Sequence, residues 1–188
     1  MKRTKTSIVL EAVAWGLASV LLIITLLYYN VFHKQENNRV YGVGETCPNF
    51  VVTTYATGGA AAGKFEPKLS RGKVTVLNFW YMDCGPCLAE LPHFNEVQEE
   101  YGERVAVVAL HAYSVNTEDD KQLFLDNTFP TYSLTFAQDT AEFKVYDKLG
   151  GISAYPMTVV LDKEGVIRYV RQGAMSKETL VQYIESLL

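Results

Sequence analysis

A chain of 188 residues, 48% hydrophobic and 20% charged, has the composition of one globular domain of ordinary size with accessory segments. This balance excludes wholesale disorder. The formal net charge is −4, and residues 34–188 alone carry 14 basic and 20 acidic side chains. Such a body repels nucleic acid, and no basic stripe reverses the repulsion, so nucleic acid is excluded as a partner.

The N-terminus combines a basic cluster with a long apolar segment. Lys2, Arg3 and Lys5 precede an apolar run over residues 12–32 that only one serine, one threonine and one asparagine interrupt. At about 1.5 Å per residue, a helix over this run crosses a hydrocarbon core roughly 30 Å thick. Because basic residues favour the cytoplasmic side, we predict a single-pass anchor in the lipid bilayer, with a cytoplasmic N-terminus and an extracytoplasmic body.

A cleaved signal peptide is the competing interpretation of this segment. The apolar run is longer than a typical signal-peptide core, and no small-x-small cleavage site follows it before His33. An uncleaved anchor in the cell membrane is therefore favoured. The predicted organisation is a cytoplasmic N-terminus over 1–7, a transmembrane anchor over 8–33, a polar linker over 34–44 and a globular domain over 45–188.

The globular part alternates strand and helix signals. Apolar, β-branched runs indicate buried strands, and a serine before an amphipathic segment indicates a helix start. We expect strands at 50–55, 73–80, 104–112, 157–162 and 166–170, helices from the cysteine motif to Tyr101, from Thr117, over 141–149 and after Ser176, a flexible turn at 58–63 and a hairpin turn at 163–165. This order predicts an α/β fold with a mixed central sheet flanked by helices.

Cys84 and Cys87 stand three residues apart where a predicted strand meets a predicted helix. At the first helical turn the two sulfurs can reach one disulfide bond, and the outer one faces unpaired backbone N–H groups that stabilise a thiolate. Such positions lower the pKa of a thiol from about 8.5 to roughly 3.5–7.5. We assign Cys84 as the nucleophile that forms a mixed disulfide with the substrate, and Cys87 as the resolving thiol.

A structural disulfide and half of a zinc site are the alternatives for this pair. Zinc prefers four ligands, and the remaining cysteine and histidines, Cys47, His33, His93 and His111, form no coherent site. The strand-to-helix position favours redox chemistry. We therefore expect no metal and no cofactor.

The stretch VLNFWYMDCGPCLAELPHFNEV resembles the active-site segment of the TlpA/ResA family of membrane-tethered thioredoxin-like proteins, and GGISAYPMTVVLDKEG resembles its second signature. The resemblance extends from about Val43 to Leu188. It implies a thioredoxin-like fold and a CxxC thiol-disulfide oxidoreductase.

The resemblance also implies a substrate groove around the dithiol. Pro156 is expected to be a cis-proline beside the dithiol, where the strand edge pairs with substrate backbone. Tyr155 is bulky and is expected to shape the groove together with Gly85 and Pro86. Trp80 matches an aromatic residue near the site, and plain core packing is its favoured role.

Three positions qualify the match. Asn78 stands where cytosolic thioredoxins have a buried aspartate, so no proton acceptor is assigned for Cys87. Glu90 matches the glutamate of the family's CxxC-x-x-E-x-P pattern and is expected to tune thiol proton affinity or carry protons; the alternative is a carboxylate on the helix surface. Asp83 replaces a tryptophan usual in relatives, and its charge opposes thiolate formation at Cys84.

Cys47 lies in the segment GETCPNF, which resembles the entry strand of the family. A small buried residue is the favoured interpretation, and an additional redox or intermolecular cysteine is the alternative.

The function implied by the resemblance is an extracytoplasmic protein disulfide reductase. It would receive electrons from a membrane thiol transporter of the DsbD/CcdA type and pass them to oxidised client proteins through a mixed disulfide. Two alternatives are a thiol-dependent peroxidase, since GETCPNF also resembles a peroxiredoxin opening, and a copper-binding or chaperone module, which would resemble CxxxC rather than CxxC. No residue selects a particular client.

Overall fold

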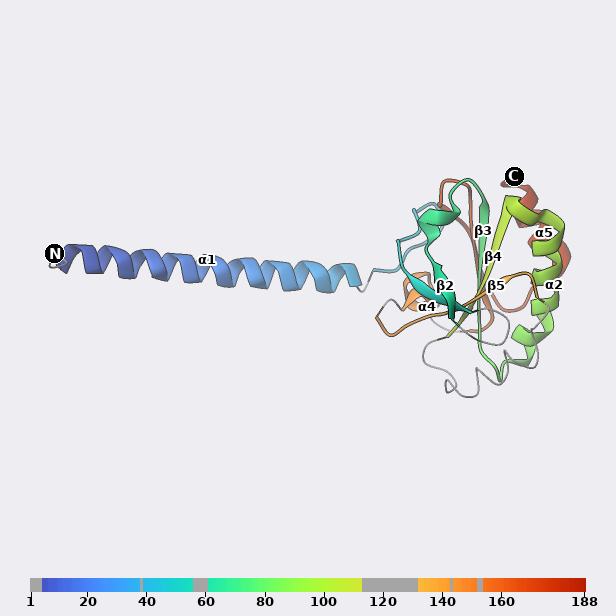
Figure 1. The fold of residues 1–188 in the computed structure, drawn as a ribbon, viewed down its shortest axis with the longest axis horizontal. Helices are drawn as coiled ribbons and strands as arrows, with labels where there is room; N and C mark the ends of the chain where they lie inside the picture. Colours follow the sequence, from blue (N-terminus) through green and yellow to red (C-terminus); the bar gives the residue numbers. More distant parts are fainter. Residues whose placement is uncertain (1–4, 38, 56–60, 113–131, 143, 152–153) are drawn as a thin grey trace. The chain divides into compact units, whose positions relative to one another are not determined.

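The computed structural model describes the chain apart from residues 1–4, 38, 56–60, 113–131, 143 and 152–153 (Figure 1). The chain divides into two compact units, Met1–Arg39 and Val40–Leu188. Helix α1 (Lys5–Asn37) makes up the first unit, and its segment Ile8–Val31 is long and apolar enough to cross a membrane.

The structure divides the expected linker, residues 34–44, between these two units. Helix α1 continues to Asn37, whereas the backbone from Val40 onward belongs to the globular unit. The Tyr41 N–H donates to the Lys148 carbonyl at 2.7 Å, and the polar composition of the segment therefore does not mark a free tether along its whole length.

The globular unit is built on a mixed sheet, which has seven strands in the part of the chain that the structure describes. The spatial order is β2-β1-β5-β4-β3-β6-β7, formed by β1 (Val52–Tyr55), β2 (Ala61–Phe65), β3 (Val74–Trp80), β4 (Val105–His111), β5 (Thr135–Gln138), β6 (Met157–Leu161) and β7 (Ile167–Gln172). Strands β3, β4 and β5 are parallel, and the other pairs are antiparallel. The predicted mixed sheet is confirmed.

Helices cover both faces of this sheet. The described helices are α2 (Gly85–Tyr101), α4 (Val145–Lys148) and α5 (Lys177–Glu185), with 3-10 turns η1 (Pro67–Ser70) and η2 (Gly102–Arg104). Helices α2 and α5 lie together on one side of the sheet, and α4 lies on the other (Figure 1). Strand β3 is buried between them along its full length, as its apolar sequence predicts.

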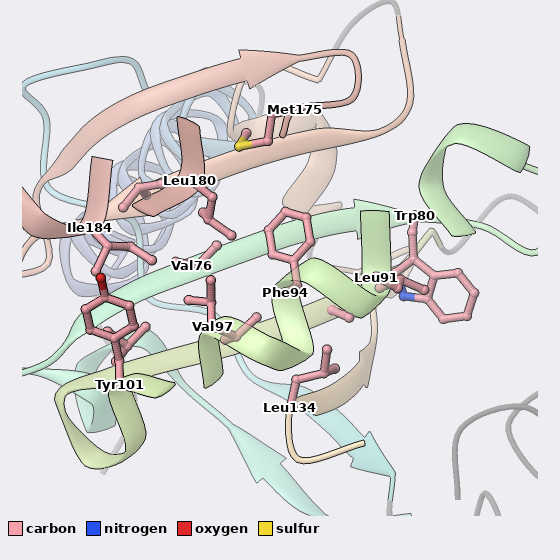
Figure 2. Packing of buried hydrophobic residues seen from close by; sticks show 14 of the residues in the cluster. Val76, Trp80, Leu91, Phe94, Val97, Tyr101, Leu134, Met175, Leu180 and Ile184 are labelled. Carbon is pink, nitrogen blue, oxygen red and sulfur yellow. The ribbon is translucent and has the colours of Figure 1, made fainter. Parts of the chain in front are cut away.

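The side chains of β3 alternate between two hydrophobic clusters, as the two-residue period of a strand requires. Val76 and Trp80 face the cluster under α2 and α5, whereas Leu77 and Phe79 face the cluster that includes α4. The helix side of the first cluster, shown in Figure 2, includes Leu91, Phe94, Val97, Tyr101, Leu180 and Ile184. Trp80, the last residue of β3, also belongs to this cluster, so the cysteine motif follows directly after a packed strand end.

Other predicted elements have mixed outcomes. The hairpin turn is present, and Gly165 takes the left-handed conformation (φ 79°) that favours glycine there. Ser176 caps α5 by accepting a hydrogen bond from the Thr179 N–H at 3.3 Å. The helix expected from Thr117 lies outside the described residues.

Two parts of the predicted layout differ from the structure. The helix expected over 141–149 is reduced to the short α4, because Lys144 takes a left-handed φ of 45° and cannot continue a helix from its N-terminal side. The expected turn at 58–63 is wrong at its end, since residues 61–63 belong to β2. Alanine and glycine have weak strand preference, so pairing with β1 determines this strand.

Candidate active site

The cysteine motif lies where β3 passes into α2. Strand β3 ends at Trp80, three residues follow, and Cys84 forms the N-cap of α2. The Cys84 Sγ accepts a hydrogen bond from the Cys87 N–H at 3.3 Å, so the sulfur meets one of the N–H groups that the first helical turn leaves unpaired. An anionic sulfur is favoured at such a position.

Cys84 and Cys87 are joined in a disulfide, with their Cα atoms 5.2 Å apart. Cys84 is 5% exposed and Cys87 is fully buried, whereas Gly85 and Pro86 between them are exposed. Proline is tolerated here because the first-turn N–H groups have no helical acceptor. A partner molecule that reaches the motif therefore meets the Cys84 sulfur and the exposed Gly-Pro pair before it meets Cys87.

The segment before β6 approaches the loop that leads from β3 to the cysteine motif. The Tyr155–Pro156 peptide bond is cis, the isomer that the family resemblance implies. Strand β6 pairs antiparallel with β3 and places Met157 opposite Phe79, so residue 156 lies next to the loop that leaves β3. Pro156 is buried, its carbonyl accepts from the Gly173 N–H at 2.8 Å, and Tyr155 is half-buried.

Glu90 lies under the motif, one helical turn after Cys87, and is only 2% exposed. Its Oε1 accepts from the Asn78 Nδ2 at 2.8 Å and its Oε2 from the Met175 N–H at 3.2 Å. The Asn78 amide also donates to the Thr158 hydroxyl at 3.2 Å. Burial raises the pKa of Glu90 to about 7, although these hydrogen bonds oppose the rise. The helix-surface interpretation of Glu90 is therefore wrong.

The remaining predicted positions have different surroundings. Trp80 is 1% exposed and packs edge-on against His111 and Phe136, with ring centroids 5.0 and 5.9 Å away, so its visible role is in the core. Asp83 is exposed directly before Cys84. Within the described ranges, no group of three or more histidine, cysteine or acidic side chains could hold a metal ion.

Cys47 is 8% exposed and belongs to the cluster on the α4 side of the sheet, together with Phe50 and Leu161. Burial raises the pKa of the Cys47 thiol to about 12. A thiol that stays protonated at neutral pH is a poor nucleophile, so the structure favours the interpretation of Cys47 as a small buried residue.

Several residues at the site were not assigned from the sequence. Met175 and Thr158 complete the polar network of Glu90, and Tyr81 and Tyr146 pack around Tyr155. Tyr81 had a local signal, because it follows a buried strand and precedes the motif. The other three come from distant parts of the chain and have no such signal.

Comparisons with known proteins agree with this geometry. A family model described as Redoxin matches residues 42–188. The chain belongs to the redoxin family. This redoxin is 31% identical over 179 residues to the thioredoxin-like protein YneN of Bacillus subtilis, which covers 90% of the chain and 96% of YneN. It is 31% identical over 162 residues, 86% of each protein, to the thiol-disulfide oxidoreductase ResA of Bacillus cereus.

Solved structures show the same fold. The pneumococcal exposed lipoprotein thioredoxin Etrx1 from Streptococcus pneumoniae superposes with a TM-score of 0.64 at 24% identity, over 74% of this redoxin and 100% of that chain. This superposition confirms the thioredoxin-like fold, and the ResA relatives confirm the resemblance to TlpA/ResA proteins. The redoxin is a thiol-disulfide oxidoreductase that exchanges disulfides with client proteins, and its apolar N-terminal helix and ResA relatives indicate a membrane-anchored protein.

Proposed function

We propose that this redoxin is a protein disulfide reductase that works outside the cytoplasm and meets its clients through Cys84. The position of Cys84 is the observation that most supports its role as the sulfur that meets clients. Its sulfur caps α2, lies within disulfide reach of Cys87, and is flanked by the exposed Gly85 and Pro86 and by the loop before β6. The Cys84 sulfur is thus the one that a partner can reach, whereas the Cys87 sulfur is fully buried next to it.

In the proposed reaction the Cys84 thiolate attacks one sulfur of a client disulfide, forms a mixed disulfide and releases the other client sulfur as a thiolate. The Cys87 thiolate then attacks the Cys84 sulfur, which closes the Cys84–Cys87 disulfide and releases the second client thiolate. Two electrons pass from the redoxin to the client. The two protons that the cysteines lose equal the two that the client thiols take up.

Glu90 is the group that we assign to the proton of Cys87. Both side chains are buried on α2, one turn apart, and Asn78 offers an amide that cannot accept a proton. A carboxyl with a pKa of about 7 is divided between its two protonation states at neutral pH, which suits a general base that must also release its proton.

We assign the supply of electrons to a partner protein in the membrane. The basic residues Lys2, Arg3 and Lys5 favour a cytoplasmic N-terminus, which would leave the globular unit on the other side of the bilayer. A reductase there needs a dithiol donor to regenerate its own dithiol, and a membrane thiol transporter of the DsbD/CcdA type fits this need. The apolar helix would hold the redoxin near such a transporter.

The reductase direction is supported by the Gly85-Pro86 pair, which is the pair between the cysteines of thioredoxin. Thioredoxin has a potential of about −270 mV and the oxidant DsbA about −120 mV, a difference of roughly 7 kcal/mol for two electrons. A dithiol with a potential near that of thioredoxin therefore passes electrons to client disulfides whose potentials are higher than about −270 mV.

The Cys87→Ala variant tests this division of roles. When the reduced variant is mixed with an oxidised peptide disulfide, we expect a stable adduct of one peptide chain on Cys84, because no thiol remains behind it to release the client. Intact-mass measurement detects the adduct, and wild type should show none at the same time point. The matched Cys84→Ala variant should also show none, because Cys87 is fully buried. An adduct formed by Cys84→Ala alone would reverse the assigned roles.

A further inference from the structure

Aromatic rings form a continuous row from the core to the loop that precedes Cys84. Phe79 of β3 meets the Tyr146 ring of α4 edge-on, with centroids 5.5 Å apart. Tyr146 stacks on Tyr155 at 4.3 Å and an interplanar angle of 9°, and Tyr155 meets Tyr81 edge-on at 5.2 Å. We refer to Tyr146, Tyr155 and Tyr81 as the tyrosine ladder. Stacked and edge-on aromatic pairs add a favourable interaction energy to the stabilisation that comes from burying their apolar surface.

The inner end of the ladder is held in place. Tyr146 is 7% exposed, and its hydroxyl donates to the Ala154 carbonyl at 2.9 Å. Its backbone N–H donates to the Asp139 carboxylate at 3.1 Å, as does the neighbouring Val145 N–H at 3.0 Å. Tyr146 thus contacts both the ring of Tyr155 and the backbone that precedes it.

The outer end of the ladder lies at the proposed client groove. Tyr155 directly precedes Pro156, and Tyr81 follows the last residue of β3, where its carbonyl accepts from the Cys84 N–H at 3.2 Å. Both outer rings are half-buried. Tyr81 comes from the loop that leads to Cys84, and Tyr155 comes from the segment before β6 that lies next to this loop.

We propose that Tyr81 and Tyr155 form a wall that binds the client residue next to the reactive disulfide, and that Tyr146 is the positioning residue that holds this wall. The wall favours clients with an aromatic or large apolar residue beside the cysteine. It disfavours acidic ones, because Asp83 is exposed next to Cys84 and acidic residues outnumber basic ones in the globular unit. This inference rests on the proposed disulfide exchange.

The test uses the full chain in detergent micelles and three disulfides: a cystine peptide with phenylalanine beside the cysteine, the same peptide with glutamate there, and hydroxyethyl disulfide. We expect wild type to have a lower KM for the phenylalanine peptide than for the glutamate peptide. Tyr146→Leu should raise that KM about tenfold with kcat within twofold, because it removes the stack under Tyr155. The rate with hydroxyethyl disulfide should not change, and Tyr146→Phe, which keeps the ring, should restore most of the affinity.

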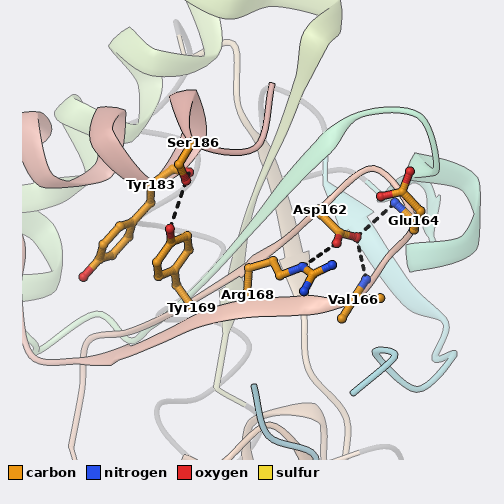
Figure 3. Close-up of polar contacts among 7 residues, drawn as sticks. All are labelled: Asp162, Glu164, Val166, Arg168, Tyr169, Tyr183 and Ser186. Atoms are coloured by element: carbon orange, nitrogen blue, oxygen red, sulfur yellow. Dashed lines mark hydrogen bonds and ion pairs between the residues drawn. The ribbon is translucent and has the colours of Figure 1, made fainter. Parts of the chain in front are cut away.

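A second stacked pair provides the matched control. Tyr169 and Tyr183 stack at 4.1 Å and 8° between β7 and α5, where the Tyr169 hydroxyl is 2.9 Å from the Ser186 hydroxyl (Figure 3). Tyr183→Leu removes a stack of the same kind outside the ladder and should leave all three disulfides unaffected. If Tyr146→Leu fails to fold, Tyr155→Ala replaces it, and we expect that variant to lose the preference for phenylalanine over glutamate.

The outcomes separate this inference from the proposed function. Two results would contradict the proposed role of Tyr81 and Tyr155 without affecting the proposal of disulfide reduction. The first is equal KM values of wild type for the two peptides. The second is a loss of rate in Tyr146→Leu that is as large with hydroxyethyl disulfide as with the phenylalanine peptide. A wild-type protein that reduces none of the three disulfides would overturn the proposed function, and the wall with it.

Discussion

Replacing Cys84 with serine should lower the rate of client disulfide reduction at least about 1000-fold, to the background of the assay. A hydroxyl at the N-cap of α2 is not ionised at neutral pH and cannot form the sulfur–sulfur bond of the mixed disulfide. Initial rates with a peptide disulfide and a dithiol donor measure the effect. Activity of Cys84→Ser within tenfold of wild type would contradict the role of this sulfur.

Cys47→Ala is the control for this experiment, because it removes the third cysteine of the chain without touching the motif. Burial raises the pKa of the Cys47 thiol to about 12, so the thiol contributes no nucleophile near pH 7. We expect the rate of the variant to stay within about twofold of wild type. A large loss would revive the interpretation of Cys47 as an additional redox cysteine.

Glu90→Gln should remove a pH dependence of folding stability worth up to about 3 kcal/mol. The pKa of Glu90 is raised to about 7 in the folded chain from 4.5, so the folded state holds this proton more tightly than the unfolded state. Glu90 therefore costs no stability below about pH 4.5, an increasing amount between pH 4.5 and 7, and its full cost above pH 7. The free energy of unfolding of wild type should fall relative to that of the variant across this window.

Urea unfolding of the oxidised residues 34–188 at several pH values measures this difference, because the disulfide keeps Cys84 and Cys87 from titrating. Asp139, another buried carboxyl with a raised pKa, is present in both proteins and cancels. Glu103→Gln provides a control of sign, since Lys73 lowers the pKa of that exposed carboxyl and its removal should act in the opposite direction. Parallel profiles for wild type and Glu90→Gln would refute the account of Glu90.

Local patterns were enough to predict five of the seven strands that the structure describes. The apolar run after the basic cluster, the buried strand before Cys84 and the glycine of the β6–β7 hairpin each act within a few residues, so the sequence carries them directly. Strand β5 was missed because its four residues, Thr135–Gln138, show no alternation. It is held instead between β1 and β4.

The surroundings of the dithiol depend on contacts between distant segments. Asn78 donates to Glu90 from 12 residues away, and the Met175 N–H reaches the same carboxylate from 85 residues away. From sequence, a glutamate one turn after Cys87 is equally compatible with solvent exposure. Only the packing of α2 between β3 and the segment before α5 buries it and raises its pKa.

The tyrosine ladder shows the same limit. Tyr155 stood out beside Pro156, but nothing in the sequence connects it to Tyr146 on a helix of four residues. Their stacking follows from the way α4 lies on the face of the sheet opposite α2, which is a property of the whole fold.

The reduction potential of the Cys84–Cys87 pair tests the central claim most directly. The full chain is equilibrated in thiol–disulfide buffers, denatured and alkylated; the oxidised form then carries one label, on Cys47, and the reduced form carries three. We predict a potential near or below about −270 mV, which makes the redoxin a reductant for client proteins. A value near about −120 mV would make it an oxidant and would contradict the proposed direction of electron flow.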